Sequence, residues 1–409
     1  MTTAKNLIGD LGFDAANMAN VSIINLVDKL IRNAHEGRAS DIHIDPTAHG
    51  IRVRFRIDGV LHDAYVLPKS IHNEIISRIK VLARLRTDEH QATQDGRFRH
   101  DLADKGSVDL RVSIVPTYHG ENAVLRLLSD KEEVFSLDSL GFSKSDQNKI
   151  LEAIRKPNGM ILATGPTGSG KTTTLYTLIK ILNSPEVAIV TIEDPIEYAI
   201  ADIEQIQVNS KTELTFANGL RSILRQDPNI IMVGEIRDGE TAGIAVNTAL
   251  TGHLLLSTLH TNDAATTLPR LLDMGIEEYL VASTVSIAIG QRLVRKICLG
   301  CRTEDNISPA LQESLPAALL SKIKGRKKTF YKGAGCEKCG GSGYFGRLCI
   351  NEVLVADEAI REAILAKKSA AEIKRLAIAR GMTTMLDDGF QKAEHGETTL
   401  EEILRAIRE

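Results

Sequence analysis

A glycine-rich segment near residue 170 constrains the possible folds of this chain more than any other feature. Its sequence, GPTGSGKT over residues 165–172, matches the phosphate-loop pattern at every fixed position. The apolar run at residues 160–164 predicts a buried strand before it, and the apolar spacing at residues 173–179 predicts a helix after it. The backbone N–H groups of such a loop and the N-terminus of its helix bind polyphosphates. The segment therefore predicts an α/β domain that binds a nucleoside triphosphate; the alternative is a glycine-rich turn that arose by chance.

Each residue of this loop has an expected role. Lys171 is expected to reach the β- and γ-phosphates, and Thr172 is expected to ligate Mg²⁺ through its hydroxyl group. The expected cofactor is therefore ATP with Mg²⁺. The residues expected to contact the nucleotide are Gly165, Pro166, Thr167, Gly168, Ser169, Gly170, Lys171, Thr172 and Thr173.

The spacing of apolar residues divides the chain into five regions. Residues 1–128 predict a smaller α+β domain, and residues 129–142 predict a linker. In residues 143–290, apolar strands alternate with helices, which is typical of a mostly parallel sheet covered on both faces. Residues 291–354 are basic and rich in glycine and cysteine, and residues 355–409 predict a helical tail.

The expected elements can be given by residue number. The N-terminal domain is predicted to have helices at 21–34 and 71–85 and strands at 42–44, 51–57, 108–112 and 123–127. Asn20 or Ser22 could cap its first helix, and Asp58-Gly59 predicts a hairpin turn. The parallel sheet is predicted to contain strands at 161–164, 187–192, 230–233 and 254–256. Further helices are predicted at 309–323, 358–365, 370–380 and 400–408.

Composition narrows the classes of function. The 409 residues are enough for two or three domains with full cores. A net charge of -3 gives no overall attraction to nucleic acid, and 4% aromatic residues with no tryptophan supply few surfaces on which bases could stack. The sequence has neither a signal-peptide pattern nor an apolar run of the ~18 residues that span a membrane. We therefore expect a cytoplasmic protein that reaches a membrane only through partners.

Acidic residues follow two of the predicted strands. The strand at 230–233 ends in Gly234-Glu235, which resembles a Walker B element with glycine at the usual aspartate position. Glu235 is therefore predicted to act as the base or to orient the attacking water; the alternative is a glutamate that caps a helix. Glu193 and Asp194, at the end of another strand, are predicted to help hold the water shell of the metal, and the alternative is a solvated turn.

Two histidines bracket the apolar segment at 254–259. His260 is predicted to sense or hydrogen-bond the γ-phosphate, and His253 is a second candidate for nucleotide contact. For each of them, the alternative is a purely structural histidine.

Four of the five cysteines form two C-x-x-C pairs, which are Cys298 with Cys301 and Cys336 with Cys339. Four thiolates with this spacing suit a closed tetrahedral Zn²⁺ site of the structural kind. The alternative is a set of redox-active thiols. Cys349, the fifth cysteine, is predicted to be buried and not to bind metal.

Residues 224–238, LRQDPNIIMVGEIRD, resemble the signature of the GspE/PilB secretion ATPases, which drive type II secretion and type IV pilus assembly. One departure is Asn229, where aspartate is common. Four landmarks follow the order seen in that family: the Walker A segment at 165–172, the aspartate box at 191–198, the Walker B segment at 230–235 and the histidine box at 253–260. Further resemblance lies at 39–46, 54–59 and 94–97.

This resemblance implies a RecA-like core in a hexameric ring, with ATP held between the core and the N-terminal domain. It implies that Arg97 and Arg111 of the N-terminal domain, and Arg221 and Arg225 of the core, act on the γ-phosphate as arginine fingers. For any one arginine, the alternative is a surface ion pair. The tetracysteine insert favours the assembly-type members of the family over the retraction ATPases.

The function implied is that of a motor that hydrolyses ATP and moves an inner-membrane platform protein, so that pilin or pseudopilin subunits are assembled. The expected partners are further copies of the chain and that platform, with no nucleic acid and no direct insertion into the membrane. Localisation would be cytoplasmic and peripheral at the inner membrane. One alternative is a RecA-like nucleic-acid motor or binding module with a zinc knuckle, and another is a non-catalytic scaffold.

Overall fold

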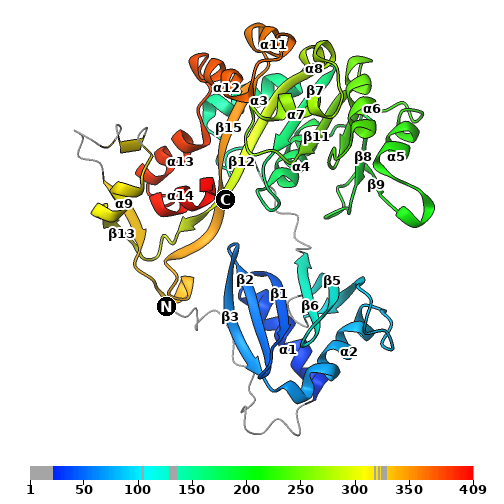
Figure 1. Cartoon of the computed structure of the whole chain (residues 1–409), viewed down its shortest axis with the longest axis vertical. Coiled ribbons are helices and arrows are strands. Elements are labelled where there is room, and N and C mark those ends of the chain that lie inside the picture. The colour runs from blue at the N-terminus through cyan, green and yellow to red at the C-terminus, as the bar shows by residue number, and fades with distance from the viewer. Residues whose placement is uncertain are drawn as a thin grey trace. The chain divides into compact units, whose positions relative to one another are not determined.

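The computed structural model describes residues 22–102, 106–128, 136–316, 319, 320, 323 and 329–408, in two compact units (Figure 1). The first unit contains the N-terminal domain together with Arg295–Glu304 and Tyr331–Gly346. The second unit contains Glu133–Val294, Asp305–Phe330 and Arg347–Glu409. None of the described helices combines the length and the hydropathy that crossing a lipid bilayer demands.

The first unit is built on a six-stranded sheet in the order β3-β2-β1-β6-β5-β4. Helix α1 begins after Ser22, whose hydroxyl accepts a hydrogen bond from the backbone N–H of Asn25, so this predicted cap is confirmed. Apolar side chains on one face of the strands pack against α1 and α2, and the alternate side chains on the other face are mostly charged. The elements are α1 (Ile23–Glu36), β1 (Ala39–Pro46), β2 (Ile51–Ile57), β3 (Val60–Leu67), η2 (Lys69–Ile71), α2 (His72–Leu82), β4 (Gln94–Asp101), β5 (Ser107–Thr117) and β6 (Gly120–Leu128).

The second unit is built on a seven-stranded sheet in the order β15-β12-β7-β11-β10-β8-β9, and the strand pairs from β12 to β9 are parallel. Its strands are β7 (Gly159–Thr164), β8 (Ile189–Glu193), β9 (Glu204–Gln207), β10 (Ile230–Val233), β11 (Leu254–Leu259), β12 (Val285–Ile297) and β15 (Tyr344–Val355). Its helices include α3 (Lys144–Ile154), α4 (Lys171–Leu182), η4 (Ser210–Thr212), α5 (Phe216–Ile223), α6 (Gly239–Leu250), α7 (Thr267–Asp273) and α8 (Glu278–Thr284).

Strand β7 is buried along its whole length, because helices cover both faces of this sheet. Met160 and Leu162 belong to a core cluster with residues of α5, α6, α7 and α8. Ile161 and Ala163 belong to a second cluster with residues of α3 and α4. This arrangement confirms the predicted α/β fold class, with a P-loop core and a smaller α+β domain.

The core sheet extends beyond residue 290, into the region predicted to hold the zinc-binding subdomain. Strands β12 and β15 join this sheet, and neither was predicted. The eight residues from Val285 to Arg292 are all buried although Ser286, Gln291 and Arg292 are polar, so neither strict alternation nor a continuous apolar run marks this strand in the sequence. Strands β3, β4 and β9 were also not predicted. Strand β4 alternates between exposed and half-buried residues without a strong apolar face.

The predicted linker and the C-terminal region have mixed outcomes. Residues 129–135 of the predicted linker lie outside the described residues, whereas Leu137, Leu140 and Phe142 are buried in the core cluster that contains α3. The helix predicted at 309–323 begins as α9 (Pro309–Ser314), and part of its remainder lies outside the described residues. The tail contains α11 (Glu358–Leu365), α12 (Ala370–Ala379), α13 (Met385–Glu394) and α14 (Leu400–Arg408), of which α13 was not predicted.

Candidate nucleotide site and metal centre

The glycine-rich segment connects β7 to α4, as the sequence predicts. Gly165, Gly168 and Gly170 have φ values of +146°, +77° and +92°, a region that other residues rarely adopt. A Cβ atom on Gly165 would lie 2.4 Å from the carbonyl oxygen of Gln291 and 2.6 Å from Ser169 Oγ. The backbone at this position therefore admits only glycine.

Lys171 is the first residue of α4 and is buried, with 8% of its surface exposed. Its Nζ donates to the carbonyl oxygens of Gly165 and Pro166, both at 2.9 Å, so the side chain folds back over the loop. Burial lowers the pKa of Lys171 to about 8, and the charge of Glu235 offsets part of that effect. Thr172, the next residue, is exposed.

The lowered pKa of Lys171 predicts that nucleotide binding takes up a proton. A polyphosphate favours the protonated amine, so binding at about pH 9 should take up close to one proton per site, and binding at about pH 7 far less. Isothermal titration calorimetry in two buffers of different ionisation heat measures this number. Lys171→Arg is the matched control, because a guanidinium stays protonated and the uptake should disappear. Equal uptake in both proteins would contradict the assignment to Lys171.

The parallel register brings the second acid and a histidine to the same edge of the sheet as the phosphate loop. Thr164, the last residue of β7, lies opposite Leu259 at the end of β11, so His260 follows beside the loop. Val233 of β10 lies opposite Ser257 of β11, so Glu235 follows at that edge as well. The carboxyl ends of parallel strands are the usual place for a ligand in such a sheet.

Glu235 lies between two basic side chains. Its Oε1 accepts a hydrogen bond from Arg237 Nη2 at 2.6 Å, and its Oε2 lies 3.0 Å from His260 Nε2. Burial raises the pKa of Glu235, but the hydrogen bonds from Arg237 and His260 outweigh it, and the pKa lies below its ordinary value. Glu235 is therefore a carboxylate at neutral pH and can accept a proton. Arg237 was not predicted, although its place two residues after Glu235 was visible in the sequence.

Glu193 is surrounded by donors of its own chain. It is buried and accepts hydrogen bonds from Thr191 Oγ1 at 2.6 Å, from Gln205 Nε2 at 3.2 Å and from the Tyr176 hydroxyl. Burial and the Glu193 charge raise the pKa of Tyr176, so this donor remains protonated. Asp194, by contrast, is exposed. The two acids that the sequence predicts together thus have very different access to a ligand.

His253 is not brought to the phosphate loop. It precedes β11, and its carbonyl oxygen accepts a hydrogen bond from Gly159 N, at the start of β7, at 3.2 Å. His260 follows the other end of the same strand, about 23 Å from His253 at roughly 3.3 Å per residue. Residues at the two ends of one strand lie at opposite edges of the sheet, so only one of the two histidines can reach the loop.

The two core arginines make local contacts. Arg221 donates to Asn218 Oδ1 at 3.2 Å and to a carboxylate oxygen of Glu240 at 2.7 Å. Arg225 donates to the carbonyl oxygen of Arg221 at 2.9 Å and to Ser222 Oγ at 3.1 Å. Both arginines are exposed. In this structure, Arg221 thus forms the surface ion pair that was its alternative interpretation.

The N-terminal arginines belong to a row that crosses the sheet of the first unit. Arg97 on β4 lies opposite Arg111 on β5, which lies opposite Arg126 on β6. Arg126 lies opposite Asp41 on β1 and donates to its carboxylate at 2.9 Å. Arg126 was not predicted. The alternation at 123–127 could have placed it on the charged face, but only the register shows that it neighbours Arg111.

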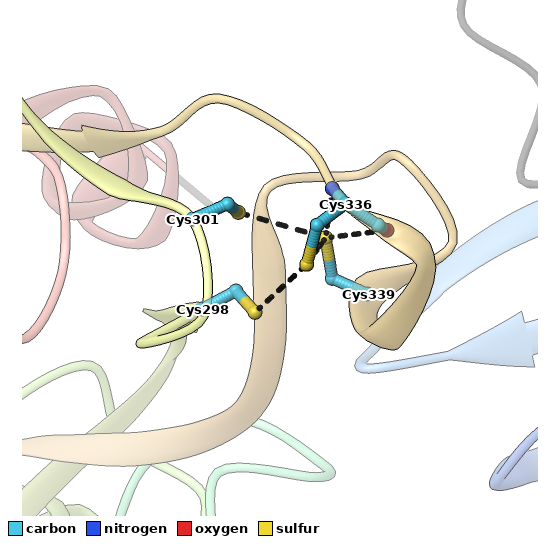
Figure 2. A group of neighbouring side chains, drawn as sticks. All are labelled: Cys298, Cys301, Cys336 and Cys339. Atoms are coloured by element: carbon cyan, nitrogen blue, oxygen red, sulfur yellow. Dashed lines mark hydrogen bonds between the residues drawn. The ribbon is translucent and has the colours of Figure 1, made fainter.

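The four paired cysteines converge on one point, as Figure 2 shows. Cys298 and Cys301 follow β12, whereas Cys336 precedes the short helix η5 (Glu337–Cys339) and Cys339 is its last residue. Their Sγ atoms all lie within 4.8 Å of one another. Three of the separations are 3.8, 3.8 and 3.7 Å. A tetrahedral metal with bonds of about 2.3 Å to sulfur places its ligands about 3.8 Å apart, so the donor set fits such an ion.

Backbone N–H groups support the thiolates of this cluster. Gly335 N donates to Cys301 Sγ at 3.3 Å, and Cys336 N and Gly343 N donate to Cys339 Sγ at 3.2 and 3.3 Å. Burial raises the pKa of Cys339, but these two N–H groups, together with the side chains of Cys336 and Cys301, outweigh it and lower the pKa to about 6. Along the chain, the first cysteine pair precedes β13 (Arg302–Asp305), and the second pair lies between β14 (Phe330–Gly333) and β15.

Cys349 is buried, as predicted, and is not one of the four cysteines of this cluster. Its Sγ lies 3.9 Å from the carbonyl oxygen of Ser169 in the phosphate loop. Burial raises the pKa of this thiol to about 11.

The combination of phosphate loop, Walker B acid and cysteine cluster agrees with comparisons to known proteins. The family model for type II/IV secretion system proteins matches residues 16–405. The chain belongs to this family. The signature at 224–238 correctly identified it, as a member of the GspE/PilB group.

Two relatives illustrate the range of the family. The chain is 48% identical over 380 residues to the type IV pilus assembly ATPase PilB of Thermus thermophilus, covering 92% of this chain and 42% of the relative. It is 46% identical over 387 residues to the type II secretion system protein E of Xanthomonas campestris, covering 95% of this chain and 68% of the relative. The chain thus spans less than half of one relative and about two thirds of the other.

Solved structures of two ATPases share the fold. The pilus retraction motor PilT with bound ADP has a TM-score of 0.62 and 28% identity, over 93% of this chain and 96% of PilT. The Legionella pneumophila ATPase DotB has a TM-score of 0.69 and 23% identity, over 98% of this chain and 99% of DotB.

Proposed function

We propose that this chain is an ATP-hydrolysing motor of a type II secretion system or a type IV pilus. The observation that carries the proposal is the meeting of Lys171, Glu235 and His260 at one edge of the core sheet. The proposal is also supported by the two relatives, which are a pilus assembly ATPase and a secretion system protein.

Each residue at this edge has a role in the proposed reaction. Lys171 would exchange its two carbonyl partners for the β- and γ-phosphates, and the exposed Thr172 hydroxyl would ligate Mg²⁺. Bound Mg²⁺ would neutralise part of the charge of the phosphates. Glu235 would orient the attacking water and accept its proton, since its carboxylate is ionised. His260, beside Glu235, would contact the γ-phosphate.

The acids after β8 divide between two roles in this proposal. The exposed Asp194 is free to contact the water shell of the metal, whereas Glu193 would hold the loop through its three protein donors. Glu193 would thus act on the metal only indirectly.

The motor would work as a homo-hexamer that acts on an inner-membrane platform protein from the cytoplasmic side. Four arginines would reach a γ-phosphate when the ring closes and would stabilise the transition state. They are Arg111 and the exposed Arg97, Arg221 and Arg225. Arg126 is a further candidate, because it lies beside Arg111. The four cysteines would hold a structural Zn²⁺.

An ATPase assay of the purified chain tests this proposal. Mg²⁺-dependent hydrolysis of ATP is expected, and Lys171→Ala should abolish it because the phosphates lose their cation. Sedimentation with an ATP analogue tests for the hexamer. Two results would overturn the proposal. Absence of hydrolysis in the hexameric protein would indicate a scaffold. Hydrolysis that requires DNA, together with DNA binding that weakens steeply with salt, would indicate a nucleic-acid motor.

A further inference from the structure

The loop that carries His260 is held by its own hydrogen bonds to the phosphate-loop strand. We use "histidine loop" for residues 260–266, between β11 and α7. Thr261 Oγ1 lies 2.5 Å from Thr164 Oγ1, and Thr261 N donates to the same Thr164 oxygen at 3.1 Å. Further along the loop, Thr266 N donates to Asp263 Oδ1 at 2.8 Å. His260 is therefore fixed on one side by its neighbours in sequence and by β7.

The other side of the histidine loop is held by two residues from the C-terminal part of the chain. Lys374 on α12 reaches Asp263, with Nζ 2.7 Å from Oδ2. Glu352 on β15 is fully buried, and its Oε1 accepts a hydrogen bond from Ala264 N at 2.8 Å. The other Glu352 oxygen lies 3.9 Å from Lys374 Nζ and accepts from Met385 N, at the start of α13, at 3.3 Å.

Burying the carboxyl group of Glu352 costs free energy unless it has polar partners. Burial raises the pKa of Glu352, and the charge of Lys374, which also pairs with Asp263, offsets part of that effect. Lys374 and Glu352 thus contact two successive residues of the histidine loop, Asp263 and Ala264. The polar network thus links α12 and α13 to the histidine loop at Asp263, three residues after His260.

We propose that Lys374 and Glu352 are positioning residues, which hold the histidine loop so that His260 stays beside Glu235 at the phosphate-loop edge. The inference rests on the proposed ATPase function. Neither residue is placed to touch the nucleotide; each acts through Asp263 or Ala264. The C-terminal helices α12 and α13 would thereby set the geometry of the hydrolytic step without changing the grip of Lys171 on the phosphates.

Steady-state kinetics of Lys374→Met test the proposal. The variant keeps the length of the side chain and removes its charge, so Asp263 loses its partner. We expect kcat for ATP to fall about tenfold or more, while KM stays within about twofold, because the phosphate loop is untouched. Lys374→Arg should recover most of the kcat. Arg375→Met is the matched control on the same helix, where the exposed guanidinium donates to the carbonyl oxygen of Ala371, and it should behave as wild type.

A double-mutant cycle shows whether Lys374 acts through Asp263. If it does, Asp263→Asn/Lys374→Met should lose no more kcat than the worse single variant. The double variant also leaves no unpaired charge at residue 263, so it can be measured if Lys374→Met folds poorly. Additive losses, or an unchanged kcat in Lys374→Met, would overturn the proposal.

Hydrogen exchange separates this inference from the proposed function. Amide exchange of residues 261–267, followed by mass spectrometry without ATP, should be about tenfold faster in Lys374→Met than in Arg375→Met. Equal exchange would overturn the positioning role whether or not the protein hydrolyses ATP. A wild-type protein that does not hydrolyse ATP, but shows the faster exchange in Lys374→Met, would overturn the proposed function and leave the loop contact standing.

Discussion

Replacement of Glu235 by glutamine is expected to lower the kcat of ATP hydrolysis by about a hundredfold or more. The carboxylate of Glu235 is ionised, because Arg237 at 2.6 Å and His260 at 3.0 Å lower its pKa. Glutamine has nearly the same shape but cannot accept the proton of the attacking water. Nucleotide affinity should change little, since Lys171 and the loop remain. Hydrolysis is measured at saturating ATP, and affinity by titration with a fluorescent ATP analogue.

A matched control for this variant is Glu186→Gln, which makes the same chemical change at an exposed residue before β8. That residue lies at the amino edge of the sheet, away from the phosphate loop, so both kcat and affinity should match wild type. If Glu235→Gln kept its kcat within about twofold of wild type, another group would have to be the base. If affinity fell as much as kcat, Glu235 would act in binding rather than in the chemical step.

The parts of the site that the sequence predicts well are those with fixed short spacing. The phosphate loop needs particular residues within eight positions, and the structure places all of them on one strand–loop–helix unit. Each C-x-x-C pair is also a local turn, so its two sulfur atoms had to lie close together. In both cases the backbone geometry of a few residues decides the outcome.

Other features depend on register and on packing between distant segments. His253 and His260 are equivalent in the sequence, and only the direction of β11 in a parallel sheet separates them. Glu193 and Asp194 are neighbours, but Tyr176 and Gln205, from elsewhere in the chain, enclose Glu193 alone. The contact of Lys374 with Asp263 joins residues 111 positions apart, and no local pattern reports it.

The position of the cysteine cluster is a further example of such a long-range effect. Its two segments group with the N-terminal domain and not with the core sheet that precedes and follows them. Within that unit, the Arg38 guanidinium lies 3.7 Å from the centre of the Phe345 ring, and Gly346 N donates to Asp58 Oδ2 at 3.1 Å. The hairpin turn at Asp58 therefore contacts the chain just after the second cysteine pair, which the sequence alone did not predict.

Loss of one cysteine from the cluster is expected to release the metal and unfold the segment around it. We expect Cys336→Ser to contain far less than the one zinc ion per chain that wild type should hold, because three thiolates leave the tetrahedral site open. A structural zinc contributes on the order of 10 kcal/mol to the folding of its domain. We therefore do not expect the short strands β13 and β14 to stay folded without the metal. Metal content is measured by mass spectrometry, and unfolding by trypsin cleavage after residues near the cluster.

Cys349→Ser is the control that separates metal binding from a general need for cysteine. Cys349 is buried beside the phosphate loop and lies apart from the four metal ligands, so this variant should keep a full zinc content and its resistance to trypsin around residues 298–339. The contact of Asp58 with Gly346 makes a second consequence measurable. Amide exchange in the β2–β3 hairpin should rise in Cys336→Ser and stay unchanged in Cys349→Ser, because only the first loses the fold that places Phe345 against Arg38. Full zinc content in Cys336→Ser would show that the four sulfur atoms, despite their tetrahedral spacing, are not the ligands.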